Sequence, residues 1–365
     1  MGTGIDLAAE LDALMGKNDE NLGIQGFLDT GIPELNWILS GQYDGGMPWG
    51  RVIEMFGEAS SGKTFLATMV MIAAQRAGGI AFFCDHERSF ETKLAESIGL
   101  NLDPAHFRYI RPETIEEGFA TCTSMASLVR EKELIPSDAP MVWVMDSIAQ
   151  AIPAEKLYDS DGNRREVGQY NMRDKLALSV AMSQGMPAVA QFCGDNNMTF
   201  LALNQIRMKP GVMYGDPTTT PGGKSMEFNA STRISIGRKE ITNGKKGKDK
   251  EVLGFQITAH CTKNKVAKPF QKATWQVRFN LEGLGVSIDQ VATNLDFLVR
   301  KGIIPKAGNR VEWEGKKLYQ SQLERELKAT SDGIEKLMAL YPSGREDLED
   351  VQESDVLPEG ATMEE

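Results

Sequence analysis

The sequence predicts an α/β protein whose core is a mostly parallel sheet, followed by a small α+β domain. One observation behind this prediction is the alternation of apolar runs at 51–56, 80–85 and 141–146 with amphipathic stretches such as 63–76. Strands that alternate with helices build a parallel sheet covered by helices. The other observation is a change after residue 231 to β-rich segments joined by a basic turn, which indicates antiparallel strands extending the same sheet.

Four parts are expected along the chain. Apolar residues at near-helical spacing in 5–15 predict a short amphipathic helix, so we expect residues 1–27 to be an oligomerisation helix and linker. Its apolar stripe should pack on its own core or on a neighbouring subunit. Residues 28–281 are the expected core, 282–343 a C-terminal α+β domain, and 344–365 an acidic disordered tail.

The charge of the chain is unevenly distributed. A formal net charge of −11 argues on its face against a nucleic-acid partner, because binding to phosphates needs Lys and Arg. Residues 345–365, however, hold nine carboxylates and one arginine, and without them the chain is close to neutral. Such a tail is either a solubilising end or an anionic competitor that covers a basic surface until DNA or Mg²⁺ displaces it.

Composition also bears on the compartment. The sequence has neither an apolar run long enough to cross a bilayer nor the basic start and apolar stretch of a secretory signal. We therefore expect a cytoplasmic protein without a membrane partner, in the host cytoplasm if the gene is viral. Neither CxxC pairs nor histidines at zinc-ligand spacing accompany the scattered cysteines, so we expect them to be reduced core residues. They are Cys84, Cys122, Cys193 and Cys261.

The strongest chemical signal lies between the apolar run 51–56 and the amphipathic stretch that follows it. Residues 57–64 fit the pattern GxxxxGK[ST], in which glycines let backbone N–H groups curl around a phosphate. Lys63 would reach the β- and γ-phosphate oxygens, and the Thr64 hydroxyl would bind Mg²⁺. The expected cofactors are therefore ATP and Mg²⁺. The predicted nucleotide-binding residues of this loop are Gly57, Glu58, Ala59, Ser60, Ser61, Gly62, Lys63 and Thr64.

Two further apolar runs end in carboxylates. Asp146 ends one of them and is predicted to complete the nucleotide site and, with Thr64, to hold Mg²⁺. The other supplies Asp85 and Glu87. We assign the catalytic base, which polarises the attacking water, to Glu87, because it falls just past the strand where the chain turns outward. Asp85 is the alternative.

A phosphate loop alone leaves kinases, helicases, GTPases and recombinases open, because a fold does not determine a function. The discriminating feature is the loop at 206–224, which has four glycines and three prolines and is too long for a plain connection. Its basic side chains suit phosphates, and its apolar and aromatic ones suit bases; the alternative is a disordered surface insertion. The predicted DNA-binding residues of this loop are Arg207, Lys209, Gly211, Met213, Tyr214, Gly222, Gly223 and Lys224.

Residues 204–231 resemble, nearly residue for residue, the second DNA-binding loop of bacterial RecA recombinases. The similarity also covers 30–39, 263–270 and 291–308, so that roughly residues 28–340 can be followed. This resemblance implies a P-loop NTPase core of the RecA type and a DNA-dependent ATPase. It implies a homologous DNA recombinase that forms helical filaments on single-stranded DNA, pairs it with double-stranded DNA and exchanges strands in recombination and repair. Single-strand-binding and loader proteins are candidate partners.

The resemblance also assigns roles to three residues outside the phosphate loop. Gln205, at the end of the last strand before the loop, is implied to sense the γ-phosphate and to couple it to the order of the loop. Lys263 and Lys265 are implied to reach the ATP of a neighbouring subunit; from the residues alone they read as solvated lysines at a strand end. The predicted catalytic residues are Glu87, Lys63, Gln205, Lys263 and Lys265.

Two segments have weaker assignments. Residues 153–170 take the place of the first DNA-binding loop of the family, but they differ in sequence and are longer. Here we predict Arg173 as a DNA contact, with Arg164 and Arg165 as further candidates for phosphate contacts. The basic turn at 243–250 either meets duplex DNA or is a solvated hairpin turn.

The chain also departs from the family pattern. Glu227 stands where bacterial relatives carry a lysine that bridges subunits, and Leu94 stands where they stack a tyrosine on adenine. These departures indicate a divergent relative and are consistent with a bacteriophage origin. Two rival functions share the phosphate loop and the carboxylates: a ring-forming DNA helicase or motor of the same fold, and an ATP-switched binding protein with negligible turnover.

Overall fold

The computed structural model describes residues 23–166, 174–208, 218–244, 249–279 and 285–342. Several predictions lie outside these residues: the N-terminal helix, the acidic tail and residues 245–248 of the basic turn, together with Lys209, Gly211, Met213, Tyr214 and Arg173.

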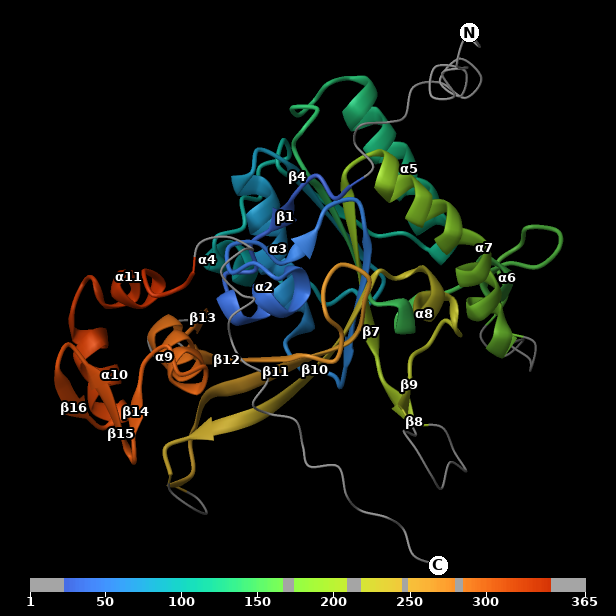
Figure 1. Cartoon of the computed structure of the whole chain (residues 1–365). Coiled ribbons are helices and arrows are strands. Elements are labelled where there is room, and N and C mark those ends of the chain that lie inside the picture. Colours follow the sequence, from blue (N-terminus) through green and yellow to red (C-terminus); the bar gives the residue numbers. More distant parts are fainter. Residues whose placement is uncertain (1–22, 167–173, 209–217, 245–248, 280–284, 343–365) are drawn as a thin grey trace, which may run out of the picture.

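A nine-stranded sheet forms the centre of the molecule, with the strand order β13-β12-β11-β10-β3-β7-β6-β4-β5 (Figure 1). From β10 to β5 the strands run parallel, and β10 to β13 pair antiparallel. The predicted parallel sheet with an antiparallel extension is thus confirmed. The strands are β3 (Val52–Gly57), β4 (Ile80–Asp85), β5 (Phe107–Ile110), β6 (Met141–Asp146), β7 (Met198–Gln205), β10 (Thr232–Thr242), β11 (Val252–Asn264), β12 (Lys272–Phe279) and β13 (Val286–Ile288).

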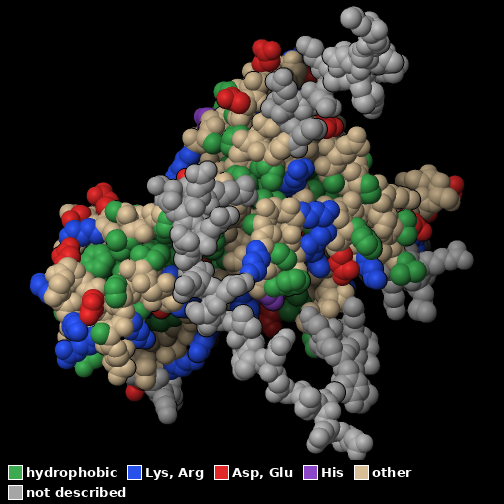
Figure 2. Space-filling model, in the orientation of Figure 1, with side chains coloured by type: hydrophobic (Ala, Val, Ile, Leu, Met, Phe, Trp, Pro, Cys, Tyr) green, Lys and Arg blue, Asp and Glu red, His purple; other side chains and the backbone are tan. Residues whose placement is uncertain are grey.

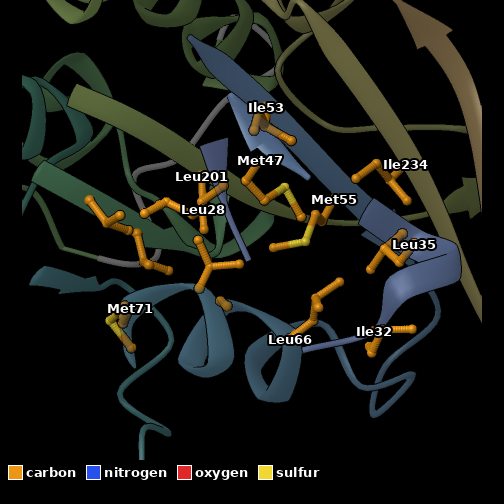
Figure 3. Packing of buried hydrophobic residues seen from close by; sticks show 14 of the residues in the cluster. Leu28, Ile32, Leu35, Met47, Ile53, Met55, Leu66, Met71, Leu201 and Ile234 are labelled. Carbon is orange, nitrogen blue, oxygen red and sulfur yellow. The ribbon is translucent and has the colours of Figure 1, made fainter. Parts of the chain in front are cut away.

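Helices cover both faces of the parallel part of this sheet. On one face, α3 and α4 pack against alternate strand residues, while α2 lies mainly on the antiparallel strands β11 and β12. Figure 3 shows Ile53, Met55 and Leu201 facing Leu66 of α3. On the other face α5 and α7 pack against the intervening residues of the strands. Strands buried on both faces read as continuous apolar runs, which explains why the sequence reveals them. These helices are α2 (Pro33–Ser40), α3 (Lys63–Arg76), α4 (Thr92–Ile98), α5 (Ile115–Glu131) and α7 (Asp174–Asp195).

Helix α7 is, among the described residues, the one helix long and apolar enough to cross a membrane by length and composition. Its residues Met182, Met186 and Val189 are buried in the cluster that packs on the sheet. The four cysteines are unpaired and buried, which confirms their prediction as core residues.

A separate hydrophobic cluster, centred on Leu295 and Leu298, lies in the C-terminal part of the chain. Glu34 of α2 binds both guanidinium nitrogens of Arg300 at 2.7 and 3.0 Å, and Tyr43 of the core packs on Phe297. These contacts fix the C-terminal part beside the sheet extension (Figure 1). Its elements are α9 (Gln290–Arg300), β14 (Lys306–Ala307), β15 (Arg310–Trp313), β16 (Lys316–Leu318), α10 (Gln320–Ala329) and α11 (Gly333–Met338).

Short elements complete the fold near the ends of the central strands. They are β1 (Phe27–Leu28), β2 (Met47–Pro48), the 3₁₀ turn η1 (Ile148–Gln150), α6 (Ala154–Leu157), β8 (Arg207–Met208), β9 (Thr218–Thr219) and α8 (Ser225–Asn229).

Candidate nucleotide and DNA-binding site

The predicted phosphate loop connects β3 to α3 at the carboxyl end of the sheet. Its backbone turns through left-handed conformations at Ser60 (φ 57°) and Gly62 (φ 99°). A Cβ on Gly57 would lie 2.2 Å from the carbonyl oxygen of Ile236, so only glycine lets β3 pass β10 here. No side chain caps the start of α3, and its first N–H groups suit an anionic oxygen.

Lys63 lies inside this loop and is only 7% exposed. Its ammonium group donates hydrogen bonds to the carbonyl oxygens of Gly57 and Glu58 at 3.2 and 2.7 Å. Burial lowers the pKa of Lys63, and the nearby carboxylates of Asp146 and Glu87 act in the opposite direction. The loop therefore encloses a cation with two carboxylates in electrostatic range.

Thr64 and Asp146 meet at the mouth of the loop. The Thr64 hydroxyl donates a hydrogen bond of 2.9 Å to Oδ2 of Asp146, which is 5% exposed. Burial raises the pKa of Asp146 to about 7, and the charges of Glu87 and Asp85 add to this effect. Mg²⁺ in nucleotide sites commonly takes one or two protein oxygens and completes its shell with phosphates and water. The hydroxyl and carboxylate brought together here fit such an ion.

The Asp85 carboxylate is fully buried, and its hydrogen bonds lie within the protein. Oδ1 accepts from the backbone N–H of Arg88 at 2.6 Å. Oδ2 accepts from the backbone N–H of Phe90 at 3.2 Å and from the Tyr109 hydroxyl at 2.6 Å. This carboxylate holds the turn after β4, and a water molecule would have to displace a donor to reach it.

Glu87, in contrast, is exposed at the end of the same turn. Its backbone N–H donates to the carbonyl oxygen of Asp146 at 3.2 Å, which fixes the turn beside the end of β6. The charge of Glu87 acts on both Lys63 and Asp146. The geometry therefore favours Glu87 over Asp85 as the base.

Replacing Asp85 with asparagine tests this division of roles. An amide can accept only through one of its two terminal atoms, so we expect the free energy of unfolding in urea to fall by about 1–3 kcal/mol. Turnover per folded molecule should fall less than in Glu87→Gln. Tyr109→Phe, which removes one donor, should destabilise less. Unchanged stability with a loss of turnover as large as in Glu87→Gln would assign the base to Asp85.

Beside the phosphate loop lies a cavity of about 420 Å³ with a mainly apolar lining. Leu94 of α4, Phe255 and Phe279 of the antiparallel strands, and Ser60 of the loop all line it. The Arg238 guanidinium lies 4.4 Å from the centre of the Phe255 ring. Through Ser60, Ser61 and Gly62 the cavity adjoins the phosphate loop directly. The sequence did not predict that residues of β10 to β12 would line a cavity beside the phosphate loop, because apolar residues in these strands are equally typical of a hydrophobic core.

The ends of the predicted second DNA-binding loop are described and lie together. Arg207 pairs with Thr219 across the short β8–β9 ladder, and Arg207 is exposed. Gly222 and Gly223 have φ values of 91° and 68°, and Cβ atoms there would lie 3.1–3.2 Å from side chains of α7. Lys224 is exposed just before α8. Close packing on α7 thus explains both glycines, and phosphate binding by the loop residues stays a prediction.

Gln205 lies next to the phosphate loop. The β3–β7 register pairs it with Gly57, and the N–H of Ile206 donates to the carbonyl oxygen of Gly57 at 3.3 Å. The second loop therefore starts at the residue that adjoins the first glycine of the phosphate loop. That Gln205 senses the γ-phosphate stays a prediction.

Lys263 and Lys265 lie at the end of β11 beside α8. Within one molecule, the ammonium group of Lys263 donates to the carbonyl oxygens of Glu227 and Phe228, while Lys265 is exposed. Burial, together with the charges of Lys265 and Arg233, lowers the pKa of Lys263. Lys and Arg side chains gather on the face that carries α8 (Figure 2). That the two lysines contact a neighbouring ATP stays a prediction.

The described part of the first loop is held by local carboxylates. An isolated bridge joins Tyr158 to Arg164, and Glu113 accepts a hydrogen bond from the Tyr158 hydroxyl and pairs with Arg164 at 3.5 Å. Arg165 donates to a backbone carbonyl oxygen of the same segment. The structure therefore gives these two arginines partners within the protein. At the basic turn, Lys250 pairs with Glu240 at 2.6 Å.

A lysine and a hydroxyl at a helix start, with carboxylates on neighbouring parallel strands, define a P-loop ATPase on an α/β sheet. The model of the RecA N-terminal domain matches residues 13–285. The chain belongs to the RecA family. This membership confirms the predicted RecA-type fold and a RecA-type recombinase with DNA-dependent ATPase activity and DNA binding.

Individual relatives carry the name Protein RecA. The protein of Leptospira meyeri is 30% identical over 323 residues, which cover 86% of this chain and 76% of the relative. The protein of Treponema denticola is 35% identical over 278 residues, or 76% and 60% of the two chains. The protein of Geobacter sulfurreducens is 32% identical over 301 residues, or 80% of each. Identities in this range agree with the divergence inferred from Leu94 and Glu227.

Proposed function

We propose that this protein is an ATP- and Mg²⁺-dependent recombinase that assembles as a helical filament on single-stranded DNA and exchanges strands with a homologous duplex in recombination and repair. The observation that carries the proposal is the pairing of Gly57 with Gln205. Through this pairing the phosphate loop and the first residues of the second DNA-binding loop lie side by side at the carboxyl end of the central strands. A change at the nucleotide can therefore be transmitted to DNA over a short path.

In the proposed nucleotide site, the loop N–H groups and Lys63 bind the β- and γ-phosphates. Thr64 and Asp146 would hold Mg²⁺, which would supply positive charge beside the phosphates. Glu87 orients the water that attacks the γ-phosphate and accepts its proton. The base of the nucleotide lies in the cavity between Leu94 and Phe255. Lys263 and Lys265 would contact the phosphates from the neighbouring subunit.

Binding of DNA would involve the backbone more than the bases. Arg207 and Lys224, at the two ends of the second loop, are exposed and suited to phosphates. Sequence recognition then belongs to Watson–Crick pairing between the bound strand and the incoming duplex. We expect the reaction to take place in the cytoplasm, with single-strand-binding and loader proteins as candidate partners.

The filament distinguishes this function from that of a ring-forming motor with the same core. A head-to-tail interface that does not close generates a helix, whereas a closing one generates a ring. Electron microscopy of the protein with single-stranded DNA and a slowly hydrolysed ATP analogue should show helical filaments. Closed rings would contradict the proposal.

A further inference from the structure

Glu54 is a carboxylate buried in the middle of the central sheet. It lies on β3, three residues before the phosphate loop, and its exposure is 0%. Its Oε2 accepts a hydrogen bond of 2.6 Å from Nε of Arg233 on β10, and its Oε1 accepts one of 3.0 Å from the side-chain amide of Asn204 on β7. A buried charge is tolerated only when it is paired and hydrogen-bonded, as this one is.

Both partners of Glu54 contact the C-terminal end of the second DNA-binding loop, at residues 220–221. The amide nitrogen of Asn204 also donates to the carbonyl oxygen of Pro221 at 3.1 Å. Nη2 of Arg233 lies 3.5 Å from the Thr220 hydroxyl. One carboxylate therefore holds, through two side chains, the segment that follows β9.

The N-terminal end of the loop is hydrogen-bonded to the same group of side chains. Oδ1 of Asn204 accepts a hydrogen bond of 3.0 Å from the backbone N–H of Gln205. The Arg233 guanidinium lies 5.0 Å from the ring centre of Phe56, the residue before Gly57. The start of the loop, its end and the strand that leads into the phosphate loop thus share one buried polar cluster.

Stability alone does not account for this cluster. Replacing a buried ion pair with apolar side chains is often neutral or stabilising, so a sheet can be held together without one. Hydrogen bonds, unlike apolar contacts, are directional and hold their partners in one geometry. Here that geometry relates both ends of the second loop to β3.

We infer that Glu54 is a positioning residue that couples nucleotide binding to DNA binding, by holding both ends of the second loop in one arrangement relative to the phosphate loop. This inference rests on the proposed function. Glu54 contacts neither ligand and acts through Asn204 and Arg233. Because coupling is reciprocal, its loss lowers the effect of ATP on DNA affinity and of DNA on ATP affinity by the same factor.

The test measures this coupling factor in the full chain. It is the ratio of the dissociation constants of a fluorescent single-stranded oligonucleotide without nucleotide and with a slowly hydrolysed ATP analogue. Asn204→Leu keeps the Glu54–Arg233 pair and removes the two hydrogen bonds that the Asn204 amide donates, one to Glu54 and one to the carbonyl oxygen of Pro221. We expect the factor to fall from about 10-fold or more to about 2-fold.

A matched control lies on the same strand. The Thr199 hydroxyl is buried and donates to the carbonyl oxygen of Pro48 at 3.1 Å, away from the cluster. Thr199→Val therefore removes a buried hydrogen bond of β7 and should keep the wild-type factor. Thermal unfolding of both variants checks that they are folded to a similar extent.

The outcomes separate this inference from the function on which it rests. A wild-type factor in folded Asn204→Leu, or an equal loss in Thr199→Val, would overturn the role of the cluster. A factor of one in the wild-type protein would instead contradict the proposed function. If Asn204→Leu does not fold, Glu54→Gln, which keeps the shape of the side chain, replaces it with the same expected loss and the same contradicting result.

Discussion

Replacing Lys63 with alanine is expected to lower ATP turnover by about 100- to 1,000-fold and to abolish nucleotide-dependent filaments. The ammonium group lies inside the phosphate loop, where it is the cation placed to bind phosphate oxygens. Removing one such electrostatic contact typically costs about 100- to 1,000-fold in rate. Phosphate release and electron microscopy with the ATP analogue measure the two effects.

Lys132→Ala is a suitable control for this variant, because Lys132 is an exposed lysine at the end of α5. It should retain wild-type turnover and filaments. Normal DNA-stimulated turnover in Lys63→Ala would show that 57–64 is not the phosphate site.

Glu87→Gln is expected to lose about 100- to 10,000-fold in DNA-stimulated turnover while filaments still form. The amide keeps the size of the side chain but cannot accept a proton from water. Because Glu87 is exposed, its replacement should change the free energy of unfolding little. Phosphate release on single-stranded DNA gives the rate, and microscopy shows the filaments.

Glu96→Gln, at an exposed position on α4, is the matched control and should turn over normally. Normal turnover in Glu87→Gln would place the base elsewhere. Wild-type protein that binds DNA in an ATP-dependent way without DNA-stimulated phosphate release would instead support the rival function of a switched binding protein.

The central sheet was predictable because its strands are buried on both faces. Apolar runs such as 141–146 have few polar positions, and helical stretches between them indicate the parallel arrangement. The pairing of β10 with β3 was not predictable in the same way. It brings residues 232–236 beside 53–57, and nothing local in either segment specifies this partner.

The phosphate site was predictable because one short pattern contains most of its chemistry. The choice of Glu87 over Asp85 as the base came from the sequence and stays a prediction, and the structure adds that Asp85 is buried while Glu87 is exposed. The polar cluster around Glu54 was missed altogether. Its members are far apart in sequence, and a single glutamate within a strand gives no signal of its partners. Likewise, nothing in the sequence indicates that Glu113 pairs with Arg164, whose contact with DNA stays a prediction.

Strand exchange between circular single-stranded DNA and linear duplex DNA tests the central claim most directly, because it examines substrate, cofactor and reaction together. With ATP and Mg²⁺, we expect joint molecules followed by nicked circular duplex, and neither product when ATP is omitted or the two DNAs are not homologous. Filaments and ATP hydrolysis without any joint molecules from homologous DNA would contradict the account.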